Sequence, residues 1–244
     1  IADLGKNSGQ SEHVRFYNTL DVVYSKAFSY VEPTDTGTNM VNGKPRYVLS
    51  IGSGYRAHPL DNRATDHFYV LFDYNTEGPA LGSDGKPTYS SITRSQLQKF
   101  TLTGSGKAIT PSLETNNGFY VELINAGSSK GGEKVLSDSL TLDNTIYFTT
   151  FRPSTGTMSS SCAADTGQSR LYKLSLKPGV SSLAVEDLNI PGIAPKPVVI
   201  MPKAPKDGDD EVDTSPKLLI STQIVDTENS EFPLKKTYWR ELKQ

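Results

Sequence analysis

The side chains best suited to chemistry gather around a glycine turn near residue 54. Arg56 and His58 follow Gly52-Ser-Gly54, and His67 lies at the start of the next apolar run. A histidine can act as an acid or a base near neutral pH. However, no serine or cysteine nucleophile motif accompanies these residues. Since polar groups in a loop must be hydrogen-bonded when buried, we expect Arg56 and His58 to hold the loop and cap strand ends.

A second candidate is an acidic run near the end of the chain. Asp207, Asp209 and Asp213 present carboxylates at short intervals, and carboxylate oxygens are ligands that Ca²⁺ prefers. The run lacks the central glycine and the downstream glutamate of an EF-hand loop. A solvated acidic loop is therefore the favoured interpretation, with calcium binding as the alternative. Asp84-Gly85 is interpreted as an ordinary turn.

Two residue types occur once each. Cys162 cannot form a disulfide within this chain, so it either pairs with a cysteine outside it or remains a free, half-buried thiol. Trp239, beside Tyr238, could stack on a sugar ring, but a core position is favoured. We therefore predict no catalytic, cofactor-binding or metal-binding residue in these 244 positions.

Composition limits the partners. The formal net charge is −2, which gives no general electrostatic reason to bind nucleic acid or anionic lipid. No apolar run is long enough for a membrane-spanning helix. The chain starts with isoleucine and carries no secretory signal, which predicts that it is a piece of a longer or processed product.

Short apolar runs separated by glycine, proline and asparagine predict an all-β fold. The expected strands cover residues 47–51, 68–72, 118–123, 133–140, 145–151, 170–176, 195–201 and 217–222. One short helix is expected over residues 91–100, capped by Ser91 or Thr93. Such a pattern fits a sandwich, a barrel or a propeller.

One stretch of the chain consists of Gly-Ser-Gly-Tyr-Arg-Ala-His-Pro-Leu at residues 52–60, followed by an Asp-x-Phe-Tyr-Val strand. This stretch resembles the C-terminal region of the PilY family. The proteins of this family are type IV pilus tip-associated adhesins. Further segments resemble the family in the same order: residues 15–22, 92–97, 118–123, 132–136, 147–153, 169–172, 190–197 and 238–241, together with Cys162.

This resemblance implies that residues 1–244 form the C-terminal part of a PilY-like β-propeller, incomplete without upstream blades. It implies a non-enzymatic role in surface adhesion and in pilus biogenesis or retraction control. The implied location is extracellular, at the pilus tip or on the cell surface of a Gram-negative bacterium. The implied partners are minor pilins, the missing N-terminal portion of the same protein, and a host-cell or abiotic surface ligand.

The sequence departs from the family in two places. The calcium loop of the family would lie before Ile1, so calcium is expected only in an upstream part. Gln223 and Ile224 stand where the family often has a second cysteine, which excludes the family-type disulfide within this chain. The alternative functions are an extracellular structural scaffold and a propeller enzyme, either a hydrolase or quinoprotein-like.

Overall fold

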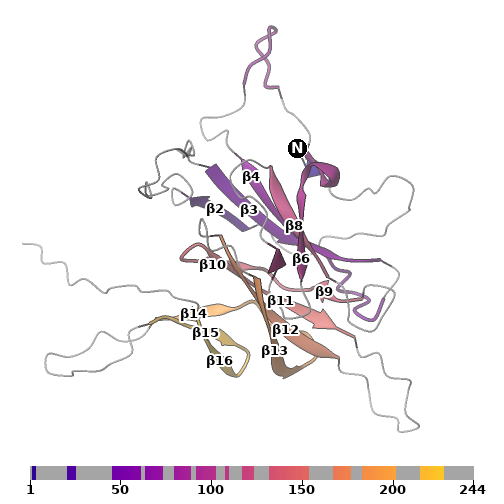
Figure 1. Ribbon diagram of the computed structural model, residues 1–244, viewed down its shortest axis with the longest axis vertical. Coiled ribbons are helices and arrows are strands. Elements are labelled where there is room, and N and C mark those ends of the chain that lie inside the picture. The colour runs from indigo at the N-terminus through magenta and orange to yellow at the C-terminus, as the bar shows by residue number, and fades with distance from the viewer. Residues whose placement is uncertain are drawn as a thin grey trace, which may run out of the picture. The chain divides into compact units, whose positions relative to one another are not determined.

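The computed structural model describes twelve stretches of the chain, shown in colour in Figure 1. They are residues 2–3, 21–25, 46–61, 64–73, 80–88, 92–102, 108–109, 117–123, 132–153, 167–176, 183–201 and 215–227. The chain divides into two units, Ile1–Lys196 and Pro197–Gln244.

The first unit contains a six-stranded sheet with the order β2-β3-β4-β8-β6-β7. Its pairs are antiparallel except for β6 and β8, which run parallel. The strands are β2 (Asp21–Ser25), β3 (Arg46–Gly52), β4 (His67–Asp73), β6 (Gln98–Leu102), β7 (Ala108–Ile109) and β8 (Gly118–Glu122).

The second large sheet is an antiparallel meander with the order β10-β11-β12-β13, and β9 pairs with one end of β11. Its strands are β9 (Lys134–Val135), β10 (Leu140–Leu142), β11 (Thr145–Arg152), β12 (Gln168–Ser175) and β13 (Leu183–Pro191). Asp143 and Asn144 turn between β10 and β11 with φ of 45° and 56°, as the paired positive φ of a tight hairpin requires. A four-stranded meander of this kind is the form of a propeller blade.

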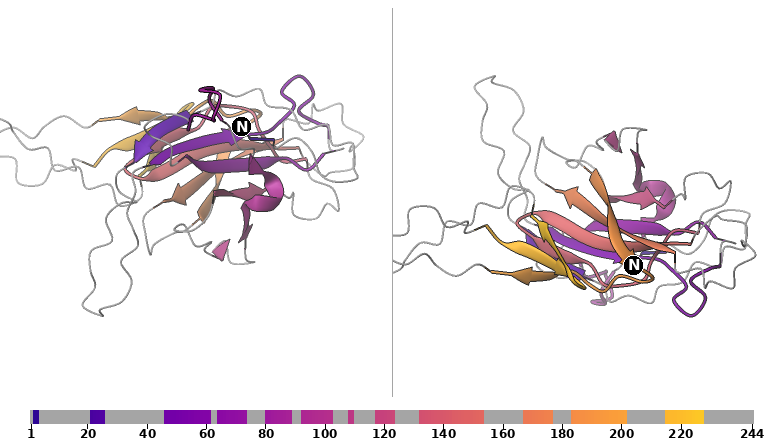
Figure 2. Two further views of the ribbon diagram at one scale, coloured as in Figure 1. Left: turned by 90° about the horizontal axis from the view of Figure 1, so that it is seen from above. Right: turned by 90° about the horizontal axis from the view of Figure 1, so that it is seen from below.

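One hydrophobic core lies between these two sheets. Alternation along β4 sends Phe68, Val70 and Phe72 to the same side, where they pack with residues of β11 and β12. The opposite face of β4 carries Tyr69 and Leu71, which pack with Leu97 in a separate cluster. The two views of Figure 2 show strands of both sheets running alongside each other in layers.

The second unit contains a three-stranded antiparallel sheet, β14-β15-β16. The strands are β14 (Val198–Ile200), β15 (Lys217–Ile220) and β16 (Gln223–Asp226). Leu218 and Ile220 are fully buried, whereas Ile224 is exposed.

The predicted all-β fold is confirmed, with each expected strand region containing at least one strand. The expected strand over 133–140 is split into β9 and β10. The expected helix over 91–100 was wrong: this stretch forms β5 (Ile92–Thr93), which pairs with β1 (Ala2–Asp3), one 3₁₀ turn (Arg94–Gln96) and then β6. The turn begins after Thr93, as expected, but pairing with β8 draws the second half into the sheet.

Incompleteness without upstream blades stays a prediction. In the described ranges, no helix has the length and apolar character needed to cross a membrane.

Candidate functional site

The Gly-Ser-Gly turn lies against β9, so the two segments form one junction between the sheets. A Cβ added to Gly52 would lie 2.3 Å from Val135 Cβ, and one added to Gly54 would lie 2.6 Å from the Val135 carbonyl oxygen. Both positions therefore require glycine because of close approach. The Val135 N–H donates to the Ser53 carbonyl oxygen over 3.0 Å, which joins the turn to β9.

Ser53 fixes the start of β4 from inside this junction. Its hydroxyl donates to Asp66 Oδ1 at 2.8 Å and accepts from the His67 N–H at 2.9 Å. The Ser53 N–H in turn donates to the His67 carbonyl oxygen at 2.8 Å. Ser53 is fully buried, so all of these bonds form away from water.

A buried lysine and a buried aspartate meet at the same junction. Lys134 Nζ lies 3.6 Å from Asp66 Oδ2, and the two side chains are 2% and 4% exposed. Nζ also donates to the carbonyl oxygens of Gly132, at 3.2 Å, and Asp61. Burial raises the pKa of Asp66, with Ser53 and Lys134 opposing that shift. Burial also lowers the pKa of Lys134, with Asp66 opposing that shift.

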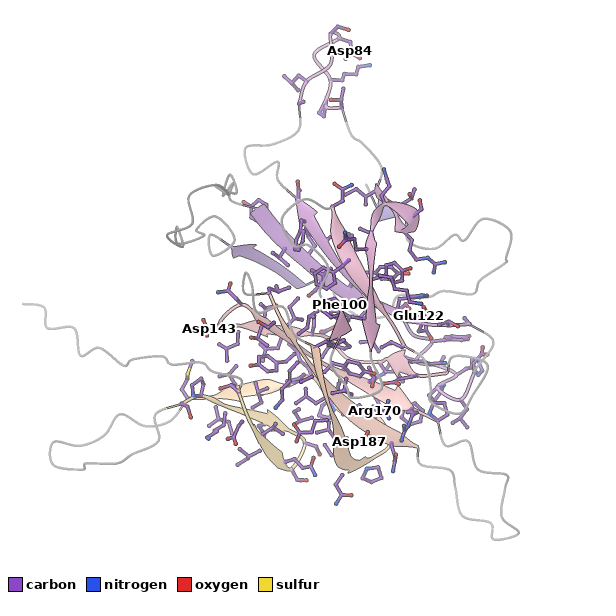
Figure 3. All side chains as sticks on the ribbon, in the orientation of Figure 1. Asp84, Phe100, Glu122, Asp143, Arg170 and Asp187 are labelled. Carbon is purple, nitrogen blue, oxygen red and sulfur yellow. The ribbon has the colours of Figure 1, made fainter. Side chains whose placement is uncertain are left out.

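Glu133, the residue before Lys134, enters a second buried polar cluster. Its Oε1 accepts from the hydroxyls of Thr150, at 2.6 Å, and Tyr172, at 2.8 Å. Its Oε2 lies 3.3 Å from an Arg170 guanidinium nitrogen. Arg170 also donates to Asp187 Oδ1 at 2.7 Å, and Figure 3 shows these two residues side by side on β12 and β13. Burial and the Glu133 carboxylate raise the pKa of Tyr172 well above its usual value.

The predicted loop-holding role of Arg56 agrees with its contact, because its guanidinium donates to the Leu136 carbonyl oxygen. His58 is exposed and packs edge-on against Tyr55, with ring centroids 4.7 Å apart. Its backbone N–H bonds to the Tyr55 carbonyl oxygen, and its carbonyl accepts from the Asp61 N–H, both at 3.0 Å. These are turn contacts of the loop after Gly54.

His67 occupies a different environment from His58. It is buried beside Tyr69 and Tyr120, with ring centroids 5.6 and 5.4 Å away. Burial, followed by the charges of Arg94 and Lys99, lowers its pKa to about 3. In the part of the chain that the structure describes, its Nδ1 has no hydrogen-bond partner. A histidine in this state is neutral at ordinary pH.

Several sequence candidates lie outside the described residues, namely Asp207, Asp209, Asp213, Cys162, Tyr238 and Trp239. Asp84-Gly85 forms the expected turn: Asp84 Oδ1 accepts from the Lys86 N–H at 3.1 Å, and Gly85 has a φ of 70°. Within the described ranges, no group of three or more histidine, cysteine, aspartate and glutamate side chains is placed to hold a metal ion.

The roles of Asp66, Glu133 and Lys134 are not predicted from the sequence, where Glu133 and Lys134 belong only to the PilY-like segment at residues 132–136. The available signal was a pair of opposite charges between Gly132 and the apolar Val135-Leu136, a place where charged side chains are expected to be buried and partnered.

The comparisons with known proteins give matches among solved structures. No protein-family model matches the chain, and no curated protein does. Among solved structures, the crystal structure of the Pseudomonas aeruginosa PilY1 C-terminal domain is similar, with 13% sequence identity and a TM-score of 0.45. The match covers 74% of this chain and 41% of that chain, so this protein spans less than half of the solved domain. The similarity between this chain and the solved domain is weak and concerns the fold.

Proposed function

We propose that this chain is the C-terminal part of a PilY-like, type IV pilus-associated protein that works in adhesion and pilus assembly without catalysing a reaction. The function is exerted at the pilus tip or the cell surface, through contacts with minor pilins and with a host-cell or abiotic surface. The missing N-terminal portion of the same protein is a further partner under this proposal.

One observation carries the proposal. Two of the segments that resemble the PilY family, residues 52–60 and 132–136, are far apart in sequence but are bonded to each other. The link consists of the Val135–Ser53 backbone bond and the Arg56–Leu136 bond, with the Lys134–Asp66 pair beside them. The residues that resemble the PilY family therefore form one structural junction. This supports a resemblance to the family's fold as a whole, and not only to separate short segments.

The same junction supports a binding role over catalysis. Arg56, Ser53 and Lys134 make contacts between the two sheets. His67 is buried and held neutral, so it is a poor proton acceptor. Because these polar residues are occupied by structural contacts, we expect the exposed loops to provide the recognition surface.

An in-frame deletion of the segment encoding residues 1–244, made in the native bacterium, tests this proposal. We expect fewer assembled pili on the cell surface and weaker attachment to a solid surface than in the parent strain. The matched control replaces the exposed Leu81 by alanine, which should leave both readouts unchanged. Normal piliation together with normal attachment after the deletion would contradict the proposal.

A further inference from the structure

The Lys134 and Asp66 side chains are arranged as reactants as well as an ion pair. Lys134 Nζ lies 3.6 Å from Asp66 Oδ2, so the amine is next to the carboxyl group that carries Cγ. Both side chains are shielded from water, so neither is solvated as an ordinary surface ion would be. The pair therefore differs from the exposed ion pairs of this chain, such as Lys217 with Asp226.

Neighbouring side-chain and backbone groups hold the Lys134 amine and the Asp66 carboxyl in place. Ser53 donates to Asp66 Oδ1 at 2.8 Å, which leaves Oδ2 facing the amine. The carbonyl oxygens of Asp61 and Gly132 orient Nζ from the other side. The Val135–Ser53 backbone bond joins β9, which carries Lys134, to the turn whose Ser53 hydroxyl bonds Asp66. Rigid elements thus position the amine and the carboxyl before any bond forms.

Burial shifts both groups toward their uncharged forms. Burial raises the pKa of Asp66 and lowers that of Lys134, which favours an uncharged acid beside an uncharged amine. The Asp61 charge raises the pKa of both groups, so it favours the uncharged acid but opposes the uncharged amine.

We propose that Lys134 and Asp66 join in an intramolecular amide bond between Nζ and Cγ. The Nζ lone pair attacks Cγ of the protonated carboxyl, and the bond from Cγ to Oδ2 breaks. Oδ2 leaves as water with its own proton and one proton from the amine. Oδ1 remains as the amide carbonyl oxygen, with the Ser53 hydroxyl stabilising the charge that develops on it. The step is a condensation and needs no oxidant or reductant.

This bond would link the start of β4 to β9, two segments 68 positions apart (134 minus 66). A covalent link between distant segments restricts the unfolded chain, as a disulfide does. The chain has a single cysteine and so cannot build that link from a disulfide of its own. The amide bond is proposed independently of the pilus function.

Mass spectrometry of the intact, denatured chain tests the proposal. The folded wild-type protein, its fold verified by a cooperative thermal transition, should be lighter than its sequence by one water molecule. Trypsin does not cut after an acylated lysine, so digestion should yield residues 64–94 branched onto a peptide that spans 131–170. The Lys134→Arg variant keeps the positive charge but should have its full sequence mass.

The Asp66→Asn variant provides a second test, because a side-chain amide reacts by releasing ammonia. That variant should be lighter than its own sequence by one ammonia molecule. A folded wild-type chain of full sequence mass would overturn the proposal and leave an ordinary buried ion pair. Loss of water mapped to another site, such as a succinimide at Asp84-Gly85, would overturn it equally.

Discussion

Phe68 of β4 and Phe148 of β11 stack face to face, with ring centroids 3.7 Å apart and ring planes 2° from parallel. Tyr172 of β12 continues the stack beyond Phe148, at 4.8 Å and 16°. The Tyr172 hydroxyl then donates to the buried Glu133. Tyr172 therefore belongs both to the aromatic stack between the two sheets and to the polar cluster around Glu133. The stack and the cluster together stabilise the junction.

Replacing Phe148 by alanine should destabilise the protein strongly. The ring is fully buried and contacts aromatic partners on both sides, so its removal leaves a cavity between the sheets. We expect a loss of about 3–5 kcal/mol in the free energy of unfolding. Urea unfolding followed by circular dichroism measures it. The exposed Leu81→Ala variant is the control, with an expected change within about 0.5 kcal/mol. Equal losses in both variants would show that the stack does not support the fold.

The two carboxylates that contact Arg170 should contribute unequally. Glu133 is fully buried and Asp187 is 67% exposed. We expect Glu133→Gln to cost about 3–5 kcal/mol, because it leaves buried partners unpaired. Asp187→Asn should cost less than about 1 kcal/mol, as for other surface pairs. Denaturant titration of both variants makes the comparison, and a larger loss for Asp187→Asn would refute the assignment of Glu133 as the buried centre of the cluster.

Gly52 should be intolerant of a side chain because of Val135. A Cβ at this position would overlap the Val135 side chain, so Gly52→Ala should cost about 1–3 kcal/mol. The Val135→Gly change removes the clashing atoms. A double variant should therefore lose less stability than the sum of the two single variants. Strict additivity in the thermodynamic cycle would place the cause of the Gly52→Ala loss elsewhere.

His67 should make the folded state sensitive to acid. Its folded pKa of about 3 lies below the ordinary value of 6.5, so the unfolded chain binds a proton first as the pH falls. Stability should then decline from about pH 6.5 toward about pH 3, by up to roughly 4 kcal/mol from this group. The His67→Phe variant removes the titration and should lose less stability over that range. Urea midpoints at several pH values test this, and identical pH dependence in both proteins would rule it out.

Sequence patterns predicted many of the strands, but not β6 or β13. Short apolar runs predicted β4, β11 and β12, and the turn at residues 143–144 falls between the strands expected over 133–140 and 145–151. These features depend on local chemistry, which a single sequence records directly.

Features that depend on tertiary contacts were not predictable in this way. The helical pattern over residues 91–100 gave way to pairing of β6 with β8, a partner about twenty positions away. Glu133 and Lys134 look like an ordinary charged pair in the sequence, and only the fold shows that one bonds to Tyr172 and the other reaches Asp66. Burial of charge is a property of the assembled sheets, so composition alone could not reveal it.

The most direct test of the proposed function is immunogold electron microscopy of native cells with an antibody raised against this chain. The account predicts gold particles at the tips of type IV pili. Gold spread over the cell envelope, with pili unlabelled, would contradict the assignment to the pilus tip.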